Sequence, residues 1–131
     1  MTAIGIQAAV AGMALRWIDI CALDDLPYDA GVAARLEPGD GSSRQIALFR
    51  IEDSDELYAI ANLDPFSRAN VLGRGILCRI GGEPAVASPV FKQHFRLRDG
   101  RCVEDDSVTV EVFPVRVIGG RVEVAVAEGA G

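Results

Sequence analysis

The side chains able to bind a soft metal ion are three cysteines and one histidine, namely Cys21, Cys78, Cys102 and His94. Together they would form a Cys₃His site, but structural zinc sites usually bring their ligands as close pairs in the sequence, and no C-x-x-C pair is present. Three cysteines also cannot all pair with one another, which is typical of a reducing cytoplasm rather than of a secreted disulfide framework. We therefore interpret them as buried or incidental thiols in a cytoplasmic protein, with an independent metal protein as an alternative.

Catalytic arrangements of other kinds are not indicated. His94 is the single histidine of the chain, but no nucleophile or paired carboxylate accompanies it, which favours a hydrogen-bonded structural histidine. Residues 52–56 carry four carboxylates without the spaced ligands and the glycine of a calcium loop. Gly81 and Gly82 lie at an expected turn, and no G-x-G-x-x-G motif leads into a helix, which argues against a bound dinucleotide. We thus predict neither a catalytic residue nor a metal or cofactor site in this chain.

Two proline-centred loops contain the remaining candidate residues. The first reads Asn62-Leu63-Asp64-Pro65-Phe66 and the second reads Ala87-Ser88-Pro89-Val90-Phe91, and each follows an apolar run. The oxygens of Asp64 and Ser88 could bind a hard cation weakly. An aspartate before proline, however, commonly braces its own loop through backbone N–H groups.

The phenylalanines of these loops allow two interpretations. Either both side chains fill the core, or they remain exposed for a partner protein. In the second case they belong to an apolar docking patch whose members would be Pro65, Phe66, Pro89, Phe91 and Lys92. Interface hot spots are often aromatic residues surrounded by polar ones, and both loops fit this pattern. The residues alone leave both alternatives open for each phenylalanine.

The elements that must position these loops are short strands. Apolar patterning predicts strands near residues 17–20, 32–36, 45–51, 57–61, 76–80, 85–88, 94–97, 108–117 and 121–126. Single helical turns are expected at residues 22–27 and 68–75, and a reverse turn at residues 81–84. Pro114 separates two sets of valines of opposite parity, which predicts a bulge or a strand break. Many short strands between Gly, Pro and Asp turns indicate an all-β sandwich or barrel.

Length and charge restrict the partners. A chain of 131 residues suits one domain, and its net charge of −6 argues against nucleic-acid and membrane partners, which need clustered Lys and Arg. Residues 17–126 are expected to form the domain and residues 127–131 a flexible tail. Residues 1–16 lack the basic region of a secretory signal and the length of a membrane span, so we expect a disordered extension, with Met13 as an alternative start of translation.

The order of motifs along residues 17–126 resembles the Rieske-type ferredoxin fold, an antiparallel β-sandwich with short helical turns. The chain reads W-x-D-I, L-Y-A-I-x-N, the two proline loops, F-x-L-x-D-G and F-P-V-R-V-x-x-G-x-V-x-V. Within that superfamily, this chain resembles the small subunit of assimilatory NAD(P)H-dependent nitrite reductase in its motifs N-L-D-P-F-S, V-A-S-P and K-Q-H-F-R-L.

A true Rieske domain binds a [2Fe-2S] cluster through a Cys-x-His loop and a Cys-x-x-His loop. The resemblance places Asp64 and Phe66 at the first pair of ligand positions, and Ser88 and Phe91 at the second pair. The thiolates and imidazoles are therefore missing. The nitrite reductase small subunits are known for keeping the Rieske architecture without these ligands, so the replacements follow the pattern of that family.

This resemblance implies a non-catalytic subunit without a cofactor of its own. Its partner would be a large subunit that carries FAD, siroheme and a [4Fe-4S] cluster and reduces nitrite to ammonia. The present chain has neither the cysteines for such a cluster nor the fold for a dinucleotide. The alternative is a cluster-free Rieske-fold interaction module that serves another oxidoreductase, such as a ring hydroxylase.

Overall fold

The part of the chain that the structure describes contains ten strands and two short 3₁₀ helices. The structure is a computed structural model, and it describes residues 14–52 and 54–127. The expected extension at residues 1–13 and the expected tail at residues 128–131 lie outside the described residues. In order, the elements are β1 (Leu15–Ala22), η2 (Leu23–Asp25), β2 (Gly31–Leu36), β3 (Arg44–Arg50), β4 (Leu57–Ala61), η3 (Leu72–Arg74), β5 (Ile76–Ile80), β6 (Glu83–Ala87), β7 (His94–Arg96), β8 (Val112–Phe113), β9 (Val115–Ile118) and β10 (Arg121–Ala127).

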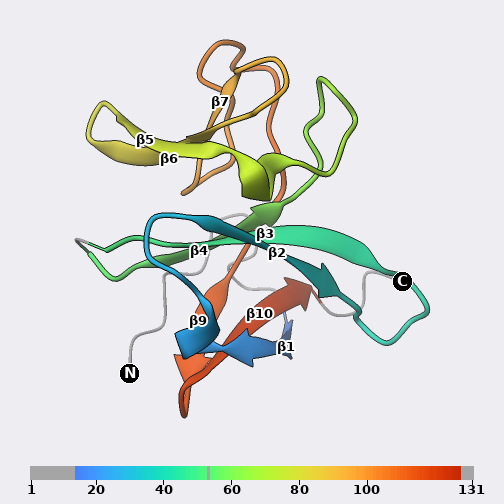
Figure 1. Cartoon of the computed structure of the whole chain (residues 1–131). Helices are drawn as coiled ribbons and strands as arrows, with labels where there is room; N and C mark the ends of the chain where they lie inside the picture. Colours follow the sequence, from blue (N-terminus) through green and yellow to red (C-terminus); the bar gives the residue numbers. More distant parts are fainter. Residues whose placement is uncertain (1–13, 53, 128–131) are drawn as a thin grey trace.

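The strands form three antiparallel sheets that lie in layers. The central sheet has the order β2-β3-β4-β8, the β1-β10-β9 sheet covers one face, and the β5-β6-β7 sheet lies over the other (Figure 1). Strand β3 explains this arrangement, because side chains alternate between the two faces of a strand. Ile46 and Leu48 belong to the core on one side, whereas Ala47 and Phe49 belong to the core on the other.

Most of the predicted elements are confirmed. Strands β4 and β5 have the predicted bounds, and η2 and η3 lie within the two predicted helical turns. Strands β8 and β9 are separated at Pro114, as the change of parity predicts. Strand β1 begins at Leu15 and β10 ends at Ala127, slightly outside the expected domain limits at residues 17 and 126.

The prediction of a four-residue turn at residues 81–84 is wrong. Strand β6 already begins at Glu83, which pairs with Ile80, so Gly81 and Gly82 alone make the turn. Both glycines have positive φ angles, of 60° and 82°. Two consecutive residues of this kind form a type I′ hairpin, whose twist matches that of the flanking strands. Pro84 therefore belongs to β6, where its Cα is paired with that of Arg79.

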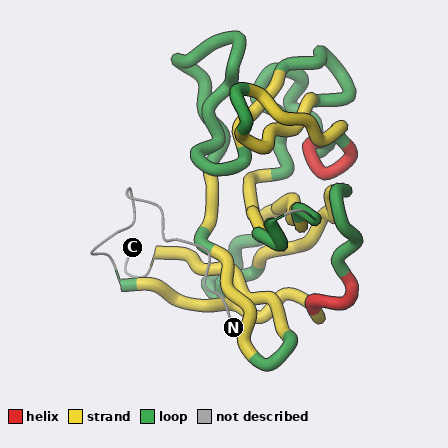
Figure 2. The backbone as a smooth tube through the Cα atoms, turned by 90° about the vertical axis from the view of Figure 1, so that its left-hand side faces the viewer, coloured by secondary structure: helices red, strands yellow, loops and turns green. Residues whose placement is uncertain are grey.

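Loops make up much of the layer that contains β5, β6 and β7 (Figure 2). The two proline-centred loops belong to this layer, because the first runs from β4 toward η3 and the second connects β6 to β7. Gly75 allows β5 to begin beside the end of β6, since a Cβ at this position would collide with the carbonyl oxygen of Ala87. Within the described residues, no helix is long and apolar enough to cross a membrane.

Candidate functional site

The two proline loops share one backbone conformation. We call residues 62–69 loop 1 and residues 87–93 loop 2. Each is closed by two backbone hydrogen bonds, one spanning five residues and one spanning four. They join Asp64 N to Ala69 O at 2.9 Å, Arg68 N to Asp64 O at 2.8 Å, Ser88 N to Gln93 O at 2.8 Å, and Lys92 N to Ser88 O at 3.2 Å. The loops are therefore structural counterparts, with Asp64 and Ser88 at equivalent positions.

A buried hydrogen bond connects the two loops directly. Ser88 Oγ donates to Asp64 Oδ2 at 2.5 Å, and both side chains are almost fully buried, with exposed fractions of 1% and 0%. The other carboxylate oxygen, Asp64 Oδ1, accepts a hydrogen bond from Phe66 N at 2.9 Å. This contact confirms that the aspartate braces its own loop through a backbone N–H group. One side chain thus ties loop 1 to itself and to loop 2.

The charge of Asp64 is stabilised where it lies. Burial by itself would raise the pKa of this carboxyl, but the hydrogen bonds from Ser88, Phe66 and Ser67 outweigh burial and lower the pKa below its ordinary value. A buried carboxylate is tolerated only when its oxygens are satisfied in this way. Asp64 is therefore ionised at neutral pH and is held by its neighbours.

The two phenylalanines have different surroundings. Phe66 is half-buried and packs against the core under the β5-β6-β7 layer, with its ring centroid 6.2 Å from that of Phe95. Phe91 is 58% exposed. Neither of the two interpretations therefore fits both residues, because Phe66 lies at the edge of the core and Phe91 lies in solvent.

An exposed apolar surface lies around the loop tips. Its largest exposed side chains are Leu63, Ile76, Val90 and Phe91, each at least 43% exposed, and Pro65 and Pro89 are exposed beside them. Ile76 belongs to this group because it pairs with Ala87, the residue before Ser88. We call these six residues the loop face. A groove of about 490 Å³, which Leu63 and Pro65 help to line, continues it toward β3 and β8.

Asn62 is a positioning residue that the sequence reasoning missed. Its side chain is 2% exposed, and its Oδ1 accepts a hydrogen bond from Gly73 N at 2.7 Å. Its Nδ2 donates to Gln45 Oε1 at 3.0 Å. Asn62 therefore fixes the start of loop 1 to β3 and to η3. The available signal was the period of two in β4, which places Asn62 on the same side as the buried Ile60.

His94 is hydrogen-bonded, as the sequence suggested. Its Nδ1 lies 2.5 Å from Glu104 Oε2, and its backbone N–H donates to Glu104 Oε1 at 2.8 Å. Burial would raise the pKa of Glu104, but these contacts with His94 lower it. The contacts between His94 and Glu104 hold the segment after β7 against this strand, which is a structural role.

The cysteines form no common site. Cys21 lies on β1, on the far side of the central sheet from Cys78 on β5, and burial raises the pKa of the Cys21, Cys78 and Cys102 thiols. Thiols of this kind stay protonated at neutral pH and are weak nucleophiles and weak metal ligands. Among the described residues, no group of three or more His, Cys, Asp or Glu side chains is placed to hold a metal ion.

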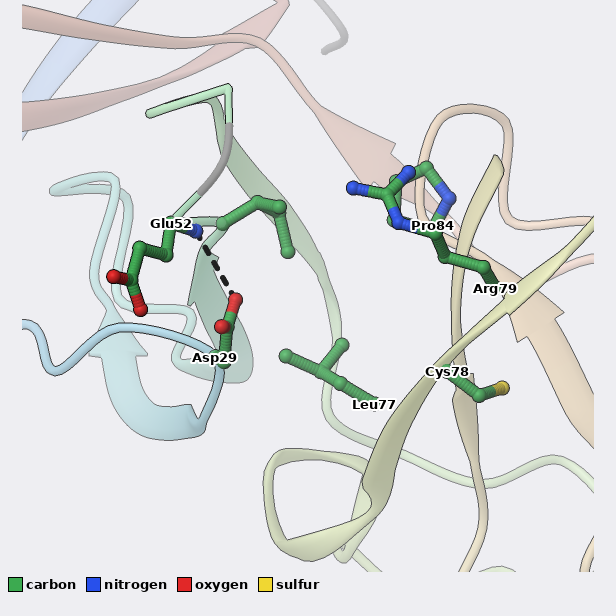
Figure 3. A pocket seen from close by; sticks show the side chains of 7 residues that line it. Asp29, Glu52, Leu77, Cys78, Arg79 and Pro84 are labelled. Carbon is green, nitrogen blue, oxygen red and sulfur yellow. Dashed lines mark hydrogen bonds between the residues drawn. The ribbon is translucent and has the colours of Figure 1, made fainter. Parts of the chain in front are cut away.

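A pocket of about 600 Å³ lies between the central sheet and the β5-β6 hairpin (Figure 3). Asp29 and Glu52 line one side, and Leu77, Arg79 and Pro84 line the other. The Asp29 carboxylate accepts a hydrogen bond from Glu52 N at 3.0 Å. The Cys78 thiol points away from Leu77 (Figure 3). The Asp29 carboxylate in this pocket is thus held by the backbone N–H group of Glu52.

Comparison with known proteins agrees with the fold and the loops. The profile of the Rieske-like [2Fe-2S] domain family matches residues 16–125. The nitrite reductase (NADH) small subunit of Escherichia coli strain K12 is 45% identical over 108 residues, which are 82% of this chain and 95% of that protein. The solution structure of the E. coli protein NirD superposes with a TM-score of 0.74 at 42% identity, covering 86% of this chain and 98% of that one.

A third relative has a different organisation. The nitrite reductase [NAD(P)H] large subunit of Klebsiella oxytoca is 50% identical over 106 residues. These residues are 81% of the present chain but only 10% of that longer protein. The present chain thus spans nearly all of the E. coli small subunit and a short segment of the K. oxytoca large subunit.

The residues that the resemblance places at the four ligand positions do not fit the cluster that the family description names. A [2Fe-2S] centre of this type needs two thiolates and two imidazoles with free lone pairs. Phe66 and Phe91 have no lone pair to offer. The oxygens of Asp64 and Ser88 are hydrogen-bonded to each other at the point where the loops meet. The connection between the loops is thus made by a hydrogen bond between side chains.

Proposed function

Because this chain belongs to the family of Rieske-like small subunits of NADH-dependent nitrite reductase, we propose that it binds the large catalytic subunit and supports the reduction of nitrite to ammonia. In this proposal the chain has no catalytic centre. The large subunit supplies FAD, siroheme and a [4Fe-4S] cluster, as the family resemblance implies. The chain works in the cytoplasm, which is consistent with its three free cysteines.

The observation that carries the proposal is the K. oxytoca large subunit. There, a segment 50% identical to this chain is part of the same polypeptide as the rest of a large subunit. Joining two modules covalently holds them together at high effective concentration. A separate chain must reach the same arrangement through a binding surface of its own. The presence of a similar segment within the K. oxytoca large subunit therefore supports a lasting contact between this domain and its own large subunit.

We place that binding surface on loops 1 and 2, with Pro65, Phe66, Pro89, Phe91 and Lys92 as its proposed members. Phe91 is the best candidate for an anchor, because it is 58% exposed at the tip of loop 2. Aromatic residues of this kind often supply much of the energy of an interface. Phe66 contributes mainly by supporting loop 1 from below, through its contact with Phe95.

The alternative of a module for another oxidoreductase has less support. The E. coli nitrite reductase (NADH) small subunit, at 45% identity, matches 82% of this chain and 95% of its own length.

The test is reconstitution with the large subunit of the same genome. The tagged large subunit would be purified with and without this chain, and NADH-dependent nitrite reduction would be measured for both. We expect a stable complex whose activity falls when this chain is omitted. Phe91→Asp should weaken the complex, whereas Ile118→Asp should not. Ile118 is a matched control because it is 48% exposed, on β9 in the opposite layer. If no complex forms and activity is unchanged, the proposed function is wrong.

A further inference from the structure

Charge is segregated in this protein. Residues 57–98, which include both loops, contain six Lys and Arg but only two Asp and Glu, although the whole chain has a net charge of −6. One of the two carboxylates, Asp64, is fully buried. The other, Glu83, forms ion pairs with Arg96 and Arg98. Residues 57–98 are therefore a basic segment of the chain, and the remaining residues are strongly acidic.

Three exposed cations flank the loop face without an ion pair to any described residue. They are Arg68 at the end of loop 1, Lys92 at the end of loop 2, and Arg74 two positions before Ile76. Basic residues elsewhere are often neutralised, as Arg44 is by Glu111, Arg116 by Glu123 and Arg121 by Asp19. The charges beside the apolar tips are thus left available for a partner.

The backbone of the loops adds an independent observation. Arg68 and Lys92 occupy equivalent positions and both have left-handed backbone angles, with φ of 63° and 69°. Glycine adopts this conformation without a steric penalty, whereas a long side chain does not. Both loops nevertheless carry a cation at this strained position. Strain that is retained in this way is typical of residues whose side chains are needed for function.

We propose that the loop face binds an apolar patch with an acidic rim on the large subunit, and that Arg68, Arg74 and Lys92 face the carboxylates of that rim. This inference rests on the proposed function and specifies the chemistry of the partner surface. The apolar centre holds the complex together, and the basic rim accelerates and orients the encounter. A nucleic acid or an anionic membrane fits less well, because the acidic remainder of the chain would be repelled from it.

The test is the salt dependence of the association rate with the purified large subunit, measured by a surface-binding method. The variant Arg68→Gln with Lys92→Gln removes two rim charges. Its association rate should fall by at least about tenfold at low salt, since electrostatic steering contributes factors of this size. The difference should largely disappear at about 0.5 M salt, where charges are screened within a few ångströms. The dissociation rate should change much less.

A matched control removes the same net charge from the opposite layer. Arg16→Gln with Arg121→Gln alters exposed residues of β1 and β10 and should leave association nearly unchanged. If both double variants lose rate equally, only net charge matters and the docking surface is wrong. If the loop variant binds as fast as the unaltered chain at all salt concentrations, the inference is also wrong, although a stable complex would leave the proposed function intact.

Two further outcomes separate the inference from other occupants of the loop face. If the unaltered chain forms no complex with the large subunit at any salt concentration, both the proposed function and this inference fail. If the chain alone sediments as a dimer and Phe91→Asp makes it a monomer, the loop face joins two copies of this chain and the proposed partner is wrong.

Discussion

Removing the hydroxyl group of Ser88 should destabilise the fold, because it leaves Asp64 Oδ2 without the partner that lies 2.5 Å away. A hydrogen bond to a charged group contributes about 1.5–3 kcal/mol, and the site cannot admit water easily since both side chains are buried. We therefore expect Ser88→Ala to lower the free energy of unfolding by about 2 kcal/mol, measured by urea denaturation at pH 7. For a domain of this size the melting temperature should fall by roughly 8 °C.

The effect should depend on pH, with a definite sign. The hydrogen bonds to Asp64 lower its pKa in the folded state, so they stabilise the fold above the unfolded pKa of about 3.9. This stabilisation is lost as the pH falls through the lower, folded pKa. The difference between the unaltered chain and Ser88→Ala should therefore be full at neutral pH and should shrink as the pH is lowered below about 4.

A matched control separates burial from hydrogen bonding. Ser107 Oγ donates to Asp105 Oδ1 at 2.6 Å with the same chemistry, but both residues are exposed. Ser107→Ala should change stability little, because water replaces the hydroxyl group. If Ser88→Ala is as mild as Ser107→Ala, or if its effect is the same at pH 3 as at pH 7, the buried link between the loops does not stabilise the fold as we infer.

Two other predictions concern the residues around the loops. Phe91→Asp should have the melting temperature of the unaltered chain, because the side chain of Phe91 is exposed. Phe66→Ala should lower the free energy of unfolding by about 2 kcal/mol, because packing against Phe95 is lost. Equal melting temperatures for the two variants would contradict this difference. Asn62→Ala should lower the free energy of unfolding, measured by urea denaturation, by about 2 kcal/mol, because Gly73 N and Gln45 lose their hydrogen-bond partner. Hydrogen exchange at the Gly73 amide should also accelerate. An unchanged exchange rate would show that Asn62 does not hold η3 in place.

The strands and turns were largely predictable because they depend on local patterns. Strand β4 has the predicted bounds because its apolar run ends at a polar residue, and the break at Pro114 follows from the missing backbone N–H group of proline. The turn at residues 81–84 was predicted two residues too long. The consecutive positive φ angles of Gly81 and Gly82 already reverse the chain, so Glu83 and Pro84 belong to β6.

The sequence by itself carries the resemblance that places Asp64, Phe66, Ser88 and Phe91 at the ligand positions of a Rieske domain, because the motifs around them are contiguous and can be read along the chain. Only the tertiary structure decided what these residues do. Asp64 and Ser88 are 24 positions apart, and their hydrogen bond exists because the folded chain brings loops 1 and 2 together. Phe66 packs on the core while Phe91 is exposed, because burial depends on which element lies beneath each loop, and that is a property of the assembled layers rather than of either loop.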